Sequence, residues 1–218
     1  MDTQKIISHE TARQDIYKHL VESYRLPGEN IRATLAALSS NLLMLDSDAV
    51  SYVQSMQSEL DQSADLNLLT LAYARLFVGP YSLPAPPYGS IYLENERKIM
   101  GGSTLDARQR YRSFGLDVSD HIREAPDHIT IELEFMFFLI YTEIEAVRSG
   151  APGKTRDLLL HQRSFLFDHL SEWIPGFTDC ILQYSKTRFY QDLARVTRIF
   201  ITEDLEYLDR ISVPVTQE

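Results

Sequence analysis

The residues best suited to chemistry are Asp127, His128 and Glu132, which stand at the start of a long apolar segment. His128 and Glu132 are four residues apart, so both would face the same side of a helix. They could supply two ligands of a metal site, but a closed zinc site needs four, and the chain has no His-Glu-x-x-His motif. Two other interpretations stay open. Asp127 could complement the helix N-terminus while His128 hydrogen-bonds locally, or both could line a binding groove.

Other enzyme signatures are missing from the sequence. Gly150-Ala-Pro-Gly-Lys-Thr155 resembles a phosphate-binding loop, but Arg148 stands where the first glycine of that motif is required. The segment also follows an expected helix rather than a strand, which favours a turn between helices. No Gly-x-Ser-x-Gly motif or other nucleophile set can be assembled from spacing. We therefore expect neither an enzyme nor a cofactor.

A stretch rich in proline and tyrosine is the stronger lead. About 25 residues with little periodicity follow an expected helix, and connections of that length are commonly functional or disordered. The stretch contains the prolines Pro80, Pro84, Pro86 and Pro87 and the tyrosines Tyr81, Tyr88 and Tyr92. The apolar residues Leu76 and Phe77 precede it. Rigid aromatic and proline side chains suit a binding surface because little entropy is lost when they are covered. The alternative is that they pack inward and clamp two helical layers together.

Composition narrows the class of protein. The formal net charge of −10 disfavours nucleic acid as a partner and disfavours attraction to anionic membranes. Cys180 is the only cysteine, so neither an intrachain disulfide nor a cysteine zinc site is expected, and a reducing compartment is the simpler assumption. The N-terminus lacks the layout of a secretory signal, and no apolar run approaches the ~18 residues of a membrane span. We expect a cytoplasmic protein without stable membrane insertion.

Apolar residues recur at steps of three and four through most of the chain, which predicts amphipathic helices and an all-α, multi-helical bundle. A first helix capped by Ser8 should end at Pro27-Gly28, and Ser103 and Asp106 resemble a capping box. Ile91 to Leu93 could be briefly extended, and a second proline-containing break is expected from His169 to Phe177. The remaining helices are expected at about 31–45, 47–60, 65–77, 103–114, 126–150, 154–167, 178–186 and 188–208.

Three motifs stand in order between about residues 70 and 140: Tyr73-x-x-Leu-Phe-x-Gly-Pro80, Leu83-Pro-x-Pro-Pro-Tyr-Gly-Ser-Ile-Tyr92 and Ala125-Pro-Asp-His-x-x-x-Glu-Leu-x-Phe-Met136. Together they resemble the TorD/DmsD family of cytoplasmic redox-enzyme maturation chaperones. The resemblance implies one all-helical domain, with helical parts at 1–78 and 103–218 joined by a proline-rich loop at 79–102. It also implies a monomer or a homodimer, domain-swapped dimers included.

The resemblance further implies a function. Such a chaperone binds the twin-arginine leader of a molybdopterin oxidoreductase and holds the apoenzyme until its cofactor is inserted, before export. Carried over by position, the peptide-binding candidates are Tyr73, Leu76, Phe77, Tyr81, Pro87, Tyr88, Asp127 and His128. Some relatives carry tryptophan where this chain has Tyr73, Tyr81 and Tyr88, a departure that bears on the depth of the pocket and on the client.

Charge suits this role. A twin-arginine leader offers two arginines followed by an apolar segment. We expect the arginines to meet Glu124, Asp127 or Glu132, and the apolar segment to lie on the aromatic-proline surface, Pro86 included. The competing hypotheses are a metal-dependent helical enzyme that uses His128 and Glu132, and a helical adaptor that binds folded partners regardless of leaders.

Overall fold

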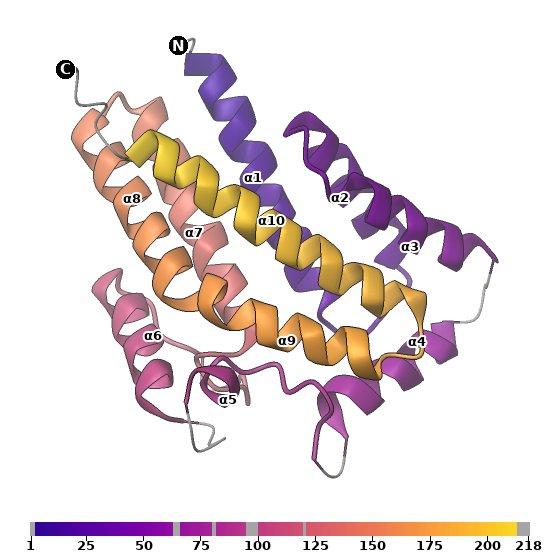
Figure 1. The fold of residues 1–218 in the computed structure, drawn as a ribbon. Coiled ribbons are helices and arrows are strands. Elements are labelled where there is room, and N and C mark those ends of the chain that lie inside the picture. The colour runs from indigo at the N-terminus through magenta and orange to yellow at the C-terminus, as the bar shows by residue number, and fades with distance from the viewer. Residues whose placement is uncertain (1–2, 63–65, 80–81, 95–99, 120, 213–218) are drawn as a thin grey trace.

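Six helices form a closed ring of contacts around the core of the molecule (Figure 1). The computed structural model describes residues 3–62, 66–79, 82–94, 100–119 and 121–212. Each helix of the ring packs on the next, and the last packs on the first. Their order around the ring is α1 (Thr3–Ser23), α7 (Ile129–Arg148), α8 (Pro152–Phe165), α10 (Arg188–Ser212), α3 (Val50–Gln62) and α2 (Ile31–Met44). Helices from both halves of the chain therefore share one hydrophobic core.

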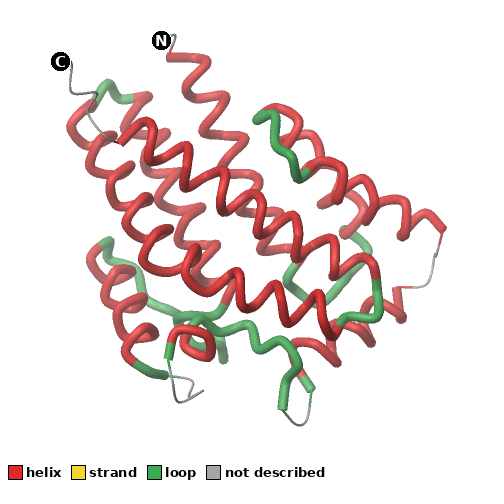
Figure 2. Tube along the Cα trace, in the orientation of Figure 1, coloured by secondary structure: helices red, strands yellow, loops and turns green. Residues whose placement is uncertain are grey.

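Four further helices lie against this ring: α4 (Leu66–Tyr73), α5 (Ser90–Leu93), α6 (Gly102–Ser113) and α9 (Ser171–Tyr184). Two single π-helical turns, Ala74–Val78 and Leu166–Leu170, extend α4 and join α8 to α9. Over the described residues the structure has no β-strand, and only an isolated bridge pairs Tyr88 with His128 (Figure 2). The predicted all-α fold is confirmed.

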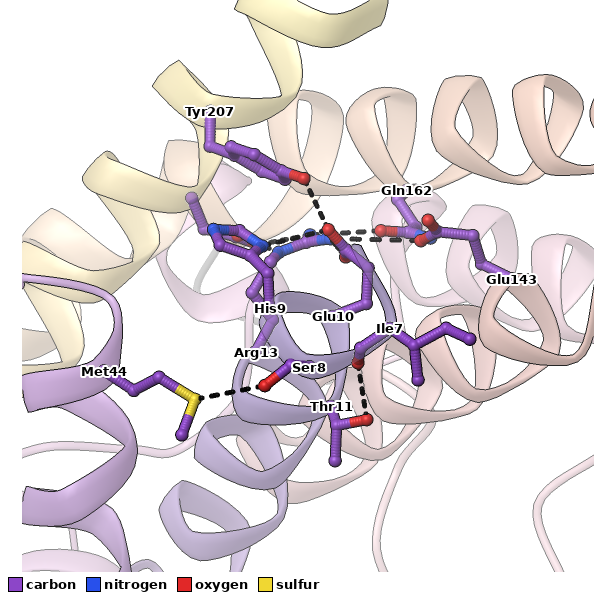
Figure 3. A network of polar contacts seen from close by, with 11 residues as sticks. Ile7, Ser8, His9, Glu10, Thr11, Arg13, Met44, Glu143, Gln162 and Tyr207 are labelled. Carbon is purple, nitrogen blue, oxygen red and sulfur yellow. Dashed lines mark hydrogen bonds and ion pairs between the residues drawn. The ribbon is translucent and has the colours of Figure 1, made fainter. Parts of the chain in front are cut away.

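Arg13 ties the N-terminal helix to three others (Figure 3). Its side chain is 1% exposed, and the guanidinium donates to Asp204 on α10, to Gln162 on α8 and to Glu10 on α1 itself. The carboxylate of Glu143 on α7 lies 3.9 Å away. One buried cation thus joins α1, α7, α8 and α10, which are four consecutive members of the ring.

The expected break from His169 to Phe177 is wrong. The chain stays helical from α8 through the π-helical turn into α9, and Pro175 lies inside α9. A proline inside a helix costs about 3 kcal/mol, whereas each fully buried large apolar side chain contributes roughly 1.5–3 kcal/mol. Trp173, Ile174 and Phe177 are all at most 1% exposed. Their burial together outweighs the proline.

Several predicted helix ends are also corrected. The first helix begins at Thr3 rather than after Ser8, and Ile91–Leu93 belongs to a helical turn rather than an extended piece. Helix α6 begins at Gly102, because the amide and hydroxyl of Ser103 both donate to Glu94 instead of forming a capping box. The long apolar helix begins at Ile129, so Asp127 and His128 precede its first turn. The last helix starts at Arg188 as expected, but it runs on to Ser212.

Candidate functional site

The proline-rich loop is fastened to the start of α7. The amide of Gly89 donates to the carbonyl of Asp127 over 2.9 Å, and the amide of Ile129 donates to the carbonyl of Pro87 over 2.9 Å. Between these bonds, the Tyr88 ring packs edge-on against the ring of His128 with 5.1 Å between centroids. The loop and the helix start therefore form one unit, although about forty positions separate them in the sequence.

Asp127 and His128 both serve this junction. Asp127 is fully buried, and its Oδ2 accepts the amide of Ser90 at the start of α5 over 2.8 Å. His128 is the N-cap of α7, where its Nδ1 accepts the amide of Thr130 over 3.2 Å. Burial lowers the pKa of His128 despite the nearby carboxylates of Glu124 and Asp127, which favours the neutral ring that a cap requires. The local role considered for His128 is thus what the structure shows.

Glu132 lies one turn further along α7 and is also fully buried. Its Oε2 accepts the indole N–H of Trp173 on α9 over 2.8 Å, and its Oε1 lies 3.3 Å from Nδ1 of His169 in the π-helical turn. The other ring nitrogen of His169 is 2.8 Å from Oδ2 of Asp106 on α6. The chain from Trp173 to Asp106 links three helices beneath the loop.

The ionisation of this chain follows from burial and pairing. Burial raises the pKa of Glu132, partly offset by its contacts with His169 and Trp173. Burial alone would lower the pKa of His169, but the carboxylates of Glu132 and Asp106 raise it overall. The raised pKa of His169, whose ring lies between two carboxylates, favours the charged imidazolium. The chain is therefore an ion-paired support.

Trp173 carries the loop above this support. Its ring stacks on Tyr92 with centroids 5.9 Å apart and an interplanar angle of 16°. A Cβ added to Gly89 would lie 3.1 Å from the indole nitrogen, so the loop backbone passes directly over the ring. Tyr92 also donates its hydroxyl to the carbonyl of Pro86 over 2.9 Å. The only tryptophan of the chain thus reports on the position of the loop.

The exposed part of the site combines tyrosine with acid. The Tyr88 hydroxyl donates to Glu124, whose side chain is 42% exposed. Burial raises the pKa of Tyr73, and the charge of the Glu124 carboxylate raises it further. Arg25, whose charge acts to lower the pKa of Tyr73, pairs with Glu134 of α7 over 2.5 Å, and both side chains of the pair are exposed. Tyr73, Tyr88, Glu124 and Glu134 define this tyrosine-acid surface, in which the carboxylates are exposed and the tyrosines are half-buried.

The other predicted site residues lie deeper or elsewhere. Phe77 is 7% exposed and packs against the rings of Tyr24, Phe177 and Tyr190, so it belongs to the core. Pro87 is buried and Pro86 half-buried, and Leu76 is 2% exposed. Tyr81 lies outside the described residues. Of the predicted residues that the structure describes, Glu124 is exposed, and Tyr73, Pro86 and Tyr88 are half-buried.

His128 and Glu132 do not converge on a shared ligand. His128 turns to Thr130 and Tyr88, whereas Glu132 turns to Trp173 and His169. Among the described residues no group of three or more histidine, cysteine, aspartate or glutamate side chains is arranged to hold a metal ion. The described helices also include none that is both long and apolar enough to cross a bilayer.

Sequence reasoning missed His169 and Trp173 as parts of the site. Their separation of four residues would place both on one helix face, and that spacing is visible in the sequence. The expectation that Pro175 breaks the helix concealed it. Asp106 was assigned to a capping box, whereas it accepts from His169 and pairs with Arg110 over 2.7 Å.

The fold is an all-helical ring with a proline-rich loop fixed across the start of its central helix. Residues 29–179 match the family described as nitrate reductase delta subunit. The chain belongs to this family, and within it to the TorD/DmsD chaperones of redox-enzyme maturation, whose members are named as chaperones and not as enzymes. The predicted family and the expectation of a non-enzyme are both confirmed.

The relatives support this placement over most of the chain. The Tat proofreading chaperone DmsD of Salmonella typhi is 30% identical over 159 residues, which cover 73% of this chain and 69% of that protein. The chaperone protein TorD of Vibrio parahaemolyticus is 25% identical over 179 residues, covering 82% and 81%. A redox enzyme maturation protein from Archaeoglobus fulgidus has the same fold, with a TM-score of 0.55, 21% identity and coverage of 88% and 93%.

Proposed function

We propose that this chain is a cytoplasmic chaperone that binds the twin-arginine leader of a molybdopterin oxidoreductase catalytic subunit. It holds the apoenzyme for cofactor insertion before export. Membership of the TorD/DmsD family supports a maturation role, and the DmsD relative is named as a Tat proofreading chaperone. The tyrosine-acid surface is the observation that carries the proposal for this chain.

The chemistry of that surface suits a cationic leader. Glu124 and Glu134 are exposed carboxylates, and an arginine can meet a carboxylate in a bidentate, charge-assisted pair. Tyr73 and Tyr88 add broad rings with polar tips beside the carboxylates, which favours contact with both the arginines and the apolar residues after them. Because exposed ion pairs contribute roughly 0–1 kcal/mol each, the charges select the leader more than they hold it.

Asp127 and Glu132 act in this proposal as supports. Both are fully buried and already hold Ser90, Trp173 and His169. They keep the loop and Tyr88 in place, and a direct contact between either carboxylate and an arginine would require the loop to move away. Their role as direct peptide ligands stays a prediction.

A titration with leader peptides tests the proposal. A tryptophan-free twin-arginine leader should change the fluorescence of Trp173, because the loop that carries Tyr88 and Tyr92 packs on this ring. The same leader with both arginines changed to lysine should bind more weakly, since lysine cannot form the bidentate pair. If wild-type protein binds no twin-arginine leader, the proposal fails.

Matched variants locate the site. Glu124→Gln should weaken leader binding by about two- to fivefold, the range that corresponds to roughly 0.4–1 kcal/mol. Tyr88→Ala should weaken it more, because it removes an aromatic ring as well as a hydrogen bond. Glu145→Gln is the control, since Glu145 is an exposed carboxylate near the opposite end of α7, where it pairs with Arg148. Equal effects of Glu124→Gln and Glu145→Gln would place the site elsewhere.

A further inference from the structure

A second surface lies on another side of α4 from the tyrosine-acid surface. It is a groove of about 370 Å³ between α4, the end of α3 and the turn that joins α9 to α10. We call it the α4 groove. Leu60, Leu69 and Leu76 form its buried floor. Its volume falls within the range of roughly 300–1,000 Å³ that is usual for ligand pockets.

The edges of the α4 groove are apolar and exposed. Leu68 is 58% exposed, Leu71 is 48% exposed and Tyr184 is 48% exposed, and all three line the groove. Single exposed apolar residues are ordinary, but large ones gathered around a concave surface are typical of interaction sites. Leu68 and Leu71 are three residues apart on α4, so they form one continuous edge. The groove therefore offers an apolar floor and apolar walls to a partner.

Charge identifies the kind of partner. Arg75 and Lys186 line the groove, and both are exposed. Over the described part of the chain neither side chain takes part in an ion pair, whereas many of the other arginines do. On a protein with a formal net charge of −10, two cations without ion pairs beside an apolar groove form a local positive field.

The one carboxylate in the lining does not cancel this field. Glu59 lies near the backbone amides of Phe189 and Arg188 at the start of α10, so its charge complements that helix N-terminus. Burial raises the pKa of Glu59, and one of its carboxylate oxygens is buried without a hydrogen-bond partner among the described residues. Arg75 and Lys186 consequently give the groove a preference for negatively charged partners.

We propose that the α4 groove binds an apolar segment that carries carboxylates, supplied by the client downstream of its leader. That this segment comes from the client rests on the proposed function. The preference of the α4 groove for acidic, apolar chains rests only on the residues that line the groove. A twin-arginine leader is cationic, so Arg75 and Lys186 repel it from this side. The protein then holds its client at two surfaces of opposite charge, and two weak contacts on one chain reinforce each other.

The test uses two labelled amphipathic peptides of equal length, identical except that glutamates in one are lysines in the other. Fluorescence anisotropy should show that wild-type protein binds the glutamate peptide about tenfold more tightly. A double variant with Arg75→Glu and Lys186→Glu should prefer the lysine peptide. The control changes the net charge equally at distant exposed positions, Lys5→Glu with Lys154→Glu, and should keep the wild-type preference.

The outcomes separate this inference from the proposed function. The charge-reversed groove variant should bind a twin-arginine leader as well as wild type does, and Glu124→Gln should leave the glutamate peptide unaffected. If wild type binds neither peptide, or if the groove variant keeps its preference for glutamate, the inference is wrong even where leader binding succeeds. A concentration-dependent dimer that the groove variant abolishes would instead assign the groove to a second copy of the chain. All the substituted side chains are exposed, so thermal melts should match wild type.

Discussion

Arg13 and Glu132 are both buried ionisable side chains, but their surroundings differ in kind. Arg13 is surrounded by the carboxylates of Glu10, Glu143 and Asp204, and its nitrogens are held by hydrogen bonds from three helices. Glu132 has one hydrogen bond from Trp173 and a contact with His169 that lacks hydrogen-bond geometry. The first cluster joins four helices of the ring to one another, whereas the second joins the central helix α7 to α9 and α6 beneath the loop.

The difference indicates what each cluster is for. A buried cation with several partners becomes very costly to remove, because its carboxylates lose their counter-charge. The Glu132 cluster has fewer bonds, and Glu132 Oε1, His169 Nδ1 and Asp127 Oδ1 lack hydrogen-bond partners among the described residues. A buried polar group without a partner destabilises the arrangement that holds it, so less free energy is lost when that part of the chain rearranges. The ring around Arg13 is thus expected to be rigid, and the loop above Trp173 to be the part that adjusts to a peptide.

The largest effect should come from breaking the Arg13 cluster. Arg13→Met keeps much of the side-chain volume but leaves three buried carboxylates without their cation. We expect a loss of about 3–5 kcal/mol in the free energy of unfolding at neutral pH, measured by urea denaturation. Arg148→Met is the control, because Arg148 forms an exposed pair with Glu145 and should change stability by at most about 0.5 kcal/mol. A loss below about 1 kcal/mol in Arg13→Met would remove the contrast between the clusters.

Glu143 gives the same cluster a pH dependence. Burial, with repulsion from Glu10, raises the pKa of Glu143 to about 7 despite the attraction of Arg13. A carboxyl whose pKa is higher in the folded state stabilises the fold fully below its unfolded pKa, and this contribution is lost as pH rises from about 4.5 to 7. Above pH 7 the loss in the free energy of unfolding approaches about 3 kcal/mol.

Glu143→Gln tests this pH dependence. Glutamine keeps an oxygen for the amide of Gln162, which donates to Glu143 over 2.7 Å, but it cannot ionise. The variant should match wild type or fall slightly below it near pH 4.5 and exceed it in stability above pH 7, as judged by denaturation across this range. A constant difference between the two proteins at every pH would show that Glu143 titrates normally.

Substitutions in the Glu132 cluster should reduce the free energy of unfolding by less than Arg13→Met does. Glu132→Leu leaves the Trp173 indole N–H buried without its acceptor, which costs about 1–3 kcal/mol. Glu132→Gln keeps an acceptor for the indole and should lose less. Trp173 emission should shift in Glu132→Leu and stay close to wild type in Glu132→Gln. Should both variants lose as much stability as Arg13→Met, the Glu132 cluster would be equally rigid, and the loop would not be the adjustable part.

The sequence predicted the helices and the family, but it predicted neither cluster. Periodic apolar residues place helices because burial of one face is a local property of the chain. Arg13 and Asp204 are 191 positions apart, and Glu132 and Trp173 are 41 apart, so no local pattern connects them. Pro175 concealed the second cluster further, since its local preference to end a helix is outweighed by the buried side chains around it. The site residues Tyr88 and Asp127 were found through motifs, but their burial and partners depend on the fold.

The smallest expected effect comes from an exposed pair beside the tyrosine-acid surface. Arg25 forms an ion pair with the carboxylate of Glu134, and both side chains are more than 40% exposed. Arg25→Ala should change stability by at most about 0.5 kcal/mol, because exposed ion pairs contribute little. It should tighten binding of a twin-arginine leader by about two- to threefold in the Trp173 titration, since Glu134 becomes available and a repelling cation is removed. Weaker leader binding in Arg25→Ala would mean that Arg25 itself contacts the leader, and the acidic character assigned to this surface would then be wrong.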